Sequence, residues 1–185
     1  MSFSKSLTAV IELATLKATA IGLTTTSECA LLTAIAAQQE CAAAILLSEA
    51  GLTEDLLTRT AINLFSSNEH TQRPLRPELS TEATAALDTA AKLAEQAKHP
   101  CVTPTHLLHC LLEVAAAKKL LKAALISRAR RETVVVSRVG QAERQDSIDD
   151  RLKELSFRTE RILAGNDTIK DRELHPSILA SSPSI

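Results

Sequence analysis

The stretch Leu79–Leu112, LSTEATAALDTAAKLAEQAKHPCVTPTHLLHCLL, contains the pattern from which the fold is predicted. Ser80 fits a helix N-cap, because its hydroxyl can accept a hydrogen bond from an unpaired amide of the first turn. Thr103 and Pro104 fit the N-cap and first position of a second helix, where the missing proline N–H costs nothing. Small apolar residues follow Ser80 at the three- and four-residue spacing of one helix face. This stripe is Ala83, Leu87, Ala90, Ala94 and Ala97.

The same pattern occurs 76 positions earlier, at the beginning of the chain. With that offset Ser4 falls on Ser80, and the pair Leu31-Leu32 falls on Leu107-Leu108. A repeated unit of this kind buries its apolar face only against a neighbour. We therefore expect the two copies, each too small for a large core of its own, to pack together. The stripe of copy one is Leu7, Ile11, Ala14, Ala18 and Ile21.

Three further helices are predicted in copy one, which spans residues 3–65. Gly22 marks the end of its first helix, and Ser27-Glu28 begins the second, with an acid near the positive helix end. A third helix covers 41–50 and ends at Gly51, and a fourth runs from Thr53 to Phe65. Residues 66–78 are polar, contain two prolines and read as a linker. Copy one is thus a four-helix unit.

Copy two is assigned to 79–127 and departs from copy one after Leu125. An extension, 128–185, follows the double repeat of 1–127. It begins with a basic cluster, which we interpret as a solvated face and which consists of Arg128, Arg130 and Arg131. Within the extension we predict one amphipathic helix, 141–164, and a disordered tail over the last twenty residues. The stripe of this helix allows two interpretations: the helix folds back on the bundle, which we favour, or it forms a homodimer seam. The stripe is Ile148, Leu152, Leu155, Thr159 and Ile162.

Composition narrows the class of protein. Of the 185 residues 45% are apolar and only 2% aromatic, glycine is scarce, and alanine and leucine abound, which predicts an all-α fold. The net charge of −1 argues against a nucleic-acid partner. The sequence contains no apolar run long enough for a membrane span, and we expect no signal peptide. We read the four cysteines as free thiols and expect a cytoplasmic protein.

No pattern predicts a catalytic or metal site. His106 and His109, with Cys101 and Cys110, could supply nitrogen and sulfur to zinc, but they lack the paired spacing of structural zinc sites. Cys29 near a helix start could have a lowered pKa, yet a buried core thiol is the favoured interpretation. We expect neither a catalytic residue, nor a bound metal, nor a cofactor.

The two copies resemble the Clp N-terminal repeat domain family, whose repeat opens with F-T and continues to G-H-x-x-[IV]-G-T-E-H-L-L. Phe3-Ser4 and Leu79-Ser80 stand at the openings, and Gly22 stands at the family glycine. In copy two the matching residues are His99, Val102 and His106-Leu107-Leu108. The resemblance covers about residues 3–124 and is more specific in copy two.

The resemblance implies two four-helix repeats related by a pseudo-twofold axis, and a non-catalytic module that docks adaptors, substrates or Clp subunits. The chain has no G-x-x-x-x-G-K-[ST] loop, so we expect an excised domain or a stand-alone accessory protein. Some family members recognise phosphorylated arginine through an acid in each T-E-H motif. The equivalent positions here are Cys29 and Thr105, so we do not expect that activity.

We therefore predict a protein-recognition module whose partners are Clp ATPase or protease subunits, adaptors or unfolded substrates. Two alternatives remain: a structural protein that oligomerises through 141–164, and an enzyme that uses Cys29 or a His/Cys metal site. The binding surface is expected between the repeats, near the openings of the first helices and the starts of the second. Its residues are Phe3, Ser4, Cys29, Leu79, Ser80 and Thr105.

Overall fold

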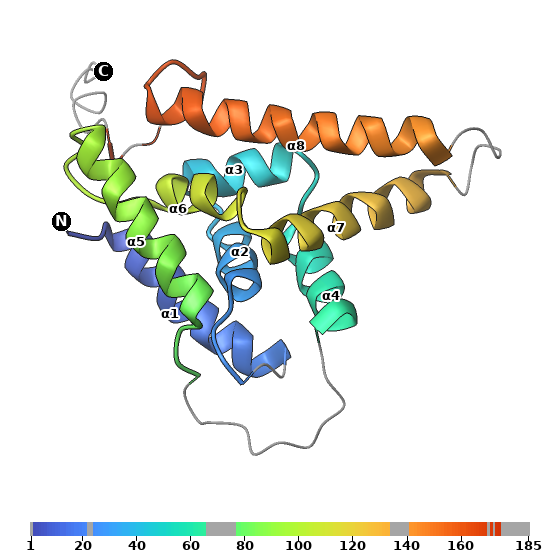
Figure 1. Ribbon diagram of the computed structural model, residues 1–185, viewed down its shortest axis with the longest axis horizontal. Helices are drawn as coiled ribbons and strands as arrows, with labels where there is room; N and C mark the ends of the chain where they lie inside the picture. The colour runs from blue at the N-terminus through green and yellow to red at the C-terminus, as the bar shows by residue number, and fades with distance from the viewer. Residues whose placement is uncertain are drawn as a thin grey trace, which may run out of the picture.

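In a computed structural model the chain is all-helical (Figure 1), which confirms the predicted fold class. The structure describes residues 2–21, 24–65, 77–133, 141–169, 171 and 173–174. Within these residues no strand occurs beyond two isolated β-bridges. The eight helices of the described part are α1 (Lys5–Ile21), α2 (Glu28–Ala37), α3 (Ala42–Glu49), α4 (Glu54–Phe65), α5 (Thr81–Gln96), α6 (Pro104–Leu111), α7 (Ala115–Thr133) and α8 (Gln141–Leu163).

Polar side chains start the helices at the predicted places. The hydroxyl of Ser80 accepts a hydrogen bond from the Ala83 amide at 3.0 Å, and that of Ser4 accepts from the Leu7 amide at 3.1 Å. Ser27 caps α2 in the same way. These contacts satisfy amides that have no partner inside their own helix. The predicted N-caps are therefore confirmed, whereas Gly22 lies outside the described residues.

The core lies around α2, which packs against α1, α3, α4, α5, α6 and α7. Every residue of α2 from Glu28 to Ile35 is buried, so this helix has no solvent-facing side over that length. The predicted stripes of both copies contribute to the same core, with Leu7, Ala14 and Ala90 fully buried. Alanines on α1 and α5 allow the helices to pack closely. Ala97, the last residue of the copy-two stripe, is exposed.

Helix α8 lies across the top of the bundle in Figure 1 and packs against α3, α6 and α7. Its predicted stripe faces the bundle: Ile148, Leu155, Thr159 and Ile162 are buried, and Leu152 is partly buried. This packing agrees with the folded-back interpretation of the helix. The apolar stripe that could have formed a homodimer seam is therefore buried against helices of the same chain.

Helices of the two copies make corresponding contacts, although α8 begins later in the chain than the 76-residue offset places the counterpart of α4. Helix α4 packs on α2 and α7, and α8 packs on α6 and α3. The two bridges obey the same offset, because Phe3 pairs with Val102 and Thr26 pairs with Leu79. A twofold axis relating the copies, and the boundary between 127 and 128, stay predictions. Helix α7 runs through that boundary to Thr133, while residues 134–140 and the linker residues 66–76 lie outside the described part.

Arg128 differs from the solvated face predicted for its cluster. It is half-buried, and its guanidinium donates a hydrogen bond to the Ala50 carbonyl at 3.1 Å, at the end of α3. Gly51 follows with φ +78°, and a Cβ there would lie 1.1 Å from Nη1 of Arg128. The glycine thus permits both the left-handed turn and the close approach of the arginine. The side chains of Arg130 and Arg131, the other members of the cluster, lie outside the described part of the structure.

Among the described residues, no single helix is long and apolar enough to cross a bilayer. Only α2 and α3 together reach that length and hydropathy, and they are bent by 92° relative to each other.

Candidate functional site

The six residues predicted for binding lie in two groups, one at the start of α6 and one at the start of α2. The backbone of Ser4 donates to the Val102 carbonyl at 2.9 Å, which brings Phe3 and Ser4 to the loop before α6. Thr105 lies in the first turn of α6. Each group therefore combines the opening of one copy with the second helix of the other.

The second group forms by the equivalent contacts. The Thr26 amide donates to the Glu78 carbonyl at 2.7 Å, and the Ser80 amide donates to the Thr26 carbonyl at 3.0 Å. The Ser80 hydroxyl also donates to the buried Glu28 carboxylate at 3.4 Å. Cys29 follows on α2. The predicted residues Leu79, Ser80 and Cys29 are thus neighbours.

Exposure divides the predicted residues further. Phe3 is 45% exposed, although it is one of only three phenylalanines in the chain. Ser4, Cys29 and Thr105 are buried, so they shape the surface from beneath. Leu79 and Ser80 are half-buried. Phe3 is consequently the large apolar side chain that the first group offers to a partner.

A histidine pair supports the start of α6. The Thr103 amide donates to Nδ1 of His106 at 3.1 Å, so the proton of neutral His106 lies on Nε2. That nitrogen lies 2.8 Å from Nδ1 of His99, to which it donates. Burial, together with the neighbouring His99 and His109, lowers the pKa of His106 to about 4. His106 is therefore neutral at physiological pH and holds the loop to the helix.

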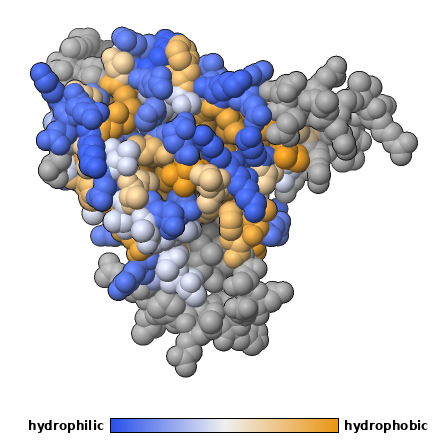
Figure 2. Space-filling model, viewed as in Figure 1, coloured by the Kyte–Doolittle hydropathy of each residue, from blue (hydrophilic) through white to orange (hydrophobic). Residues whose placement is uncertain are grey.

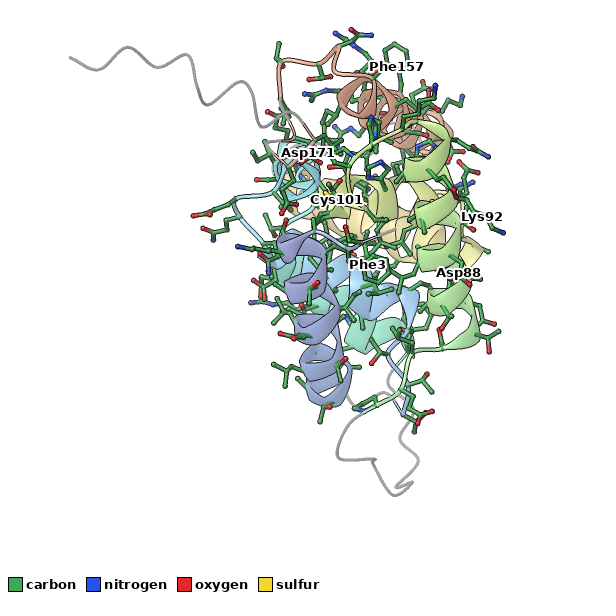
Figure 3. The ribbon with its side chains drawn as sticks, turned by 90° about the vertical axis from the view of Figure 1, so that its left-hand side faces the viewer. Phe3, Asp88, Lys92, Cys101, Phe157 and Asp171 are labelled. Carbon is green, nitrogen blue, oxygen red and sulfur yellow. The ribbon has the colours of Figure 1, made fainter. Side chains whose placement is uncertain are left out.

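The chain's C-terminal segment reaches the same place. Asp171, only 5% exposed, accepts hydrogen bonds at its Oδ2 from the hydroxyls of Thr105 at 2.6 Å and Thr103 at 2.9 Å. A carboxylate thus lies beside Thr105, the position where the predicted motif lacks its acid. Figure 3 shows Asp171 with Cys101 and Phe3 between α1 and α5.

Glu173 extends this contact to the start of α1. One of its carboxylate oxygens accepts from the Ser6 amide at 3.3 Å, and the other accepts from the Ser6 hydroxyl. The half-buried Cys101 thiol lies 3.9 Å from the Glu173 carbonyl, and Leu174 is buried. The disorder predicted for the tail therefore does not extend to these residues. Composition alone did not reveal Asp171 and Glu173, because the side-chain donors Ser6, Thr103 and Thr105 lie far away in the chain.

Asp167 anchors the beginning of this segment to α8. Arg158 on α8 donates to its carboxylate at 3.3 Å and to Glu49 on α3 at 2.6 Å. Burial would raise the pKa of Asp167, but hydrogen bonds from Arg158 and from the Ile169 amide outweigh it and lower that pKa to about 2. The carboxylate is therefore ionised at neutral pH.

The thiols do not have the environment of nucleophiles. Burial raises the pKa of Cys29 to about 12 and that of Cys110 to about 11. The Cys29 thiol contacts the Ala116 carbonyl at 3.8 Å. A thiolate is thus rare at neutral pH, which argues against the alternative in which Cys29 catalyses a reaction. In the part of the chain that is described, no three His, Cys, Asp or Glu side chains are arranged to hold a metal ion.

Surface grooves lie along α8. One of about 470 Å³ between α7 and α8 is lined by Leu112, Leu152 and Phe157 with lysines around them. Another of about 340 Å³, next to α3, is lined by Leu46 and several arginines. Figure 2 shows small apolar patches between polar residues on the face of Figure 1. The binding surface expected between the repeats stays a prediction.

Comparisons with known proteins give the chain a family and a fold. A family model described as the Clp repeat (R) N-terminal domain matches residues 78–173, just over half of the chain. The N-terminal domain of Hsp104 from Candida albicans has a similar structure, with a TM-score of 0.60 and 22% identity over 93% of this chain and 97% of that one. The N-terminal domain of the chaperone ClpD from Arabidopsis thaliana gives a TM-score of 0.55 and 17% identity, over 69% of this chain and 94% of that one. No curated protein matched in a sequence search.

Proposed function

The chain belongs to the Clp repeat (R) N-terminal domain family, and on that premise we propose that it is a non-catalytic protein-recognition module. Its partners would be Clp ATPase or protease subunits, adaptors or unfolded substrates, and its role that of an accessory or regulator of a Clp chaperone or protease. All four cysteines are free, which supports a reducing compartment such as the cytoplasm.

The observation that carries this proposal is the exposure of Phe3 beside the start of α6. Its backbone is held by the pairing with Val102, so the ring is presented from a fixed position. Large aromatic side chains dominate the energetics of protein interfaces, since they bury much apolar area at low entropic cost. We propose that Phe3, Ser4 and Thr105 form one docking surface and that Leu79, Ser80 and Cys29 form its counterpart.

Neither alternative function has a supporting observation. A scaffold that pairs through 141–164 needs an apolar face on α8, and Leu155 and Ile162 of that face are buried within one chain. An enzyme that uses Cys29 needs a thiolate, and burial raises the pKa of this thiol to about 12.

The test is capture of partners from the host lysate with the tagged full chain, with Phe3→Ala as the variant. We expect Phe3→Ala to lower the recovery of Clp subunits or unfolded clients at least fivefold, because it removes the exposed ring and keeps the backbone pairing. Quantitative mass spectrometry measures the recovery.

Phe157→Ala is the matched control, since Phe157 is 54% exposed on α8. It should leave the recovery at the wild-type level. Equal losses for the two variants, or recovery of neither partner class by the wild-type chain, would refute the proposed docking surface.

A further inference from the structure

We infer that the surface between the start of α1 and the start of α6 is a receptor site for a short acidic segment, and that this chain's own residues Asp171, Glu173 and Leu174 occupy it as a displaceable intramolecular ligand. We call the surface, formed by Ser6, Thr103 and Thr105, the acid-accepting surface. The inference rests on the proposed function and names the chemistry of the partner: a peptide with an Asp-x-Glu-Leu spacing.

The first step concerns the two threonines. Thr103 and Thr105 are fully buried, and both hydroxyls donate to the same oxygen of Asp171, at 2.9 and 2.6 Å. Buried hydroxyls without an acceptor are costly. An ionised carboxylate accepts from both at once and forms stronger hydrogen bonds than a neutral acceptor. The start of α6 is thus suited to an anion.

The second step concerns Ser6 in the first turn of α1, a helix of 17 residues. Its amide and hydroxyl both donate to the Glu173 carboxylate. The first turn of a helix favours negative charge, because its amides lack partners within the helix. Two carboxylates two positions apart therefore meet two separate sets of donors, which sets the spacing of an acceptable ligand.

The third step concerns the apolar part of the segment. Leu174 is 6% exposed and Ile169 packs against the core. Asp167 and Asp171 are buried and Glu173 is partly buried, while Asn166 and Thr168 are exposed. The Leu174 amide donates to the Asp171 carbonyl at 3.1 Å, so a turn rather than an extended backbone places Asp171, Glu173 and Leu174 against the bundle. The chain's tail therefore contacts the bundle as a bound peptide would.

Copy one differs, because the counterparts of Thr103 and Thr105 are Ser27 and Cys29, whose side chains contact the Ala30 amide and the Ala116 carbonyl. There the carboxylate is that of Glu28, which belongs to α2 itself and accepts from Ser80. In copy two the carboxylate comes from beyond α8, so it can be exchanged for one from a partner. Within the described part of the chain neither Asp171 nor Glu173 forms an ion pair, so hydroxyls and amides carry the recognition.

The test uses the full chain with Asp171→Ala and Glu173→Ala combined, and a fluorescein-labelled peptide DTIKDRELHP, which is residues 167–176. Removal of the internal carboxylates should raise the affinity for the peptide at least tenfold over the wild type, because an internal competitor no longer occupies the site. Fluorescence anisotropy measures both affinities. A peptide with asparagine and glutamine in place of its second aspartate and its glutamate should bind neither protein.

Asp88→Ala with Glu95→Ala is the matched control, because it makes the same change in charge. Both residues are exposed on α5, and Asp88 lies away from Asp171 in Figure 3. This variant should bind the peptide as weakly as the wild type. Equal affinities of the wild type and the Asp171/Glu173 variant for the peptide would overturn the inference and make the tail a fixed part of the fold.

A second variant is the test if the alanine double variant fails to fold. Asp171→Asn with Glu173→Gln keeps the side-chain volumes. This variant should also bind the peptide more tightly than the wild type does, and equal affinities of the two proteins would again overturn the inference. The outcome is separable from that of the proposed function. If the peptide binds as expected but Phe3→Ala does not change capture, only the proposed docking surface is refuted. If Phe3→Ala lowers capture but the peptide affinities are equal, only the acid-accepting surface is refuted.

Discussion

At the scale of single residues, His106 shows how one side chain joins a loop to a helix. It is fully buried, accepts from the Thr103 amide and donates to His99. Protonation would place a charge in a buried site and would remove the acceptor that the Thr103 amide needs. His106 is thus a structural residue at neutral pH, beneath the acid-accepting surface.

This arrangement predicts that stability falls on mild acidification. The pKa of His106 is about 4 in the folded chain, below the ordinary 6.5. Between these values the unfolded chain binds a proton that the folded chain does not, so the free energy of unfolding decreases as pH falls from 6.5 towards 4. We expect a loss of about 2 kcal/mol between pH 7 and pH 5 in urea unfolding.

His106→Gln is the control for this prediction, because it removes the titrating group and keeps a polar side chain. Its stability should change far less over the same pH range. Asp167 does not interfere, since its pKa of about 2 and the ordinary value both lie below pH 5. An equal pH dependence in the wild type and the variant would contradict the assignment to His106.

At the scale of elements, α8 completes the second half of the bundle. It covers α6 and α3, and Arg158 ties it to Glu49 on α3. The tail that follows α8 is thereby directed to the start of α6. Helix α8 therefore has two roles, as part of the core and as the element that positions Asp171.

The packing of α8 predicts different costs for substitutions on its two faces. Leu155 is 3% exposed and Phe157 is 54% exposed. Leu155→Ala should lower the free energy of unfolding by about 3 kcal/mol, because it leaves a cavity, and Phe157→Ala should change it by less than about 1 kcal/mol. Urea unfolding measures both.

Sedimentation of the same two variants tests the competing interpretation of the helix. If α8 packs within its own chain, Leu155→Ala leaves the solution mass unchanged. A wild-type dimer that becomes a monomer in Leu155→Ala, without a loss of monomer stability, would show that the stripe is a dimer seam instead.

At the scale of the whole molecule, two backbone pairings join the copies. Phe3 pairs with Val102 and Thr26 pairs with Leu79, so each copy supplies the opening of one pairing and the loop of the other. Leu31 of α2 and Leu107 of α6 are fully buried in a single core cluster. Neither copy can lose its packing without exposing the other.

The shared core predicts one cooperative unfolding transition for both copies. Leu31→Ala and Leu107→Ala occupy equivalent positions under the 76-residue offset. Each should lower the free energy of unfolding by about 3 kcal/mol. Each should also accelerate amide hydrogen exchange in both copies equally, as mass spectrometry of peptides from α2 and α6 would show. Two transitions, or faster exchange confined to the mutated copy, would contradict a single unit.

Local patterns in the sequence were enough to predict the all-α class, most of the helices and their N-caps, but not α7 (Ala115–Thr133). Ser4, Ser27 and Ser80 cap helices because the capping contact reaches only three residues along the chain. The apolar stripes indicated which faces would be buried, because helical periodicity is itself local. The offset between copies likewise required no knowledge of contacts.

The sequence by itself therefore determined most of the helices, their buried faces and the capping contacts between residues close together in the chain. The tertiary structure alone decided what stands beside Thr105 and how Arg128 is used, since their partners Asp171 and Ala50 lie 66 and 78 positions away. No local pattern encodes such a contact, because it depends on where α8 comes to rest on α3 and α6. The physical reason is that capping and periodicity act within a few residues, whereas the position of a returning tail is set by the packing of the whole bundle.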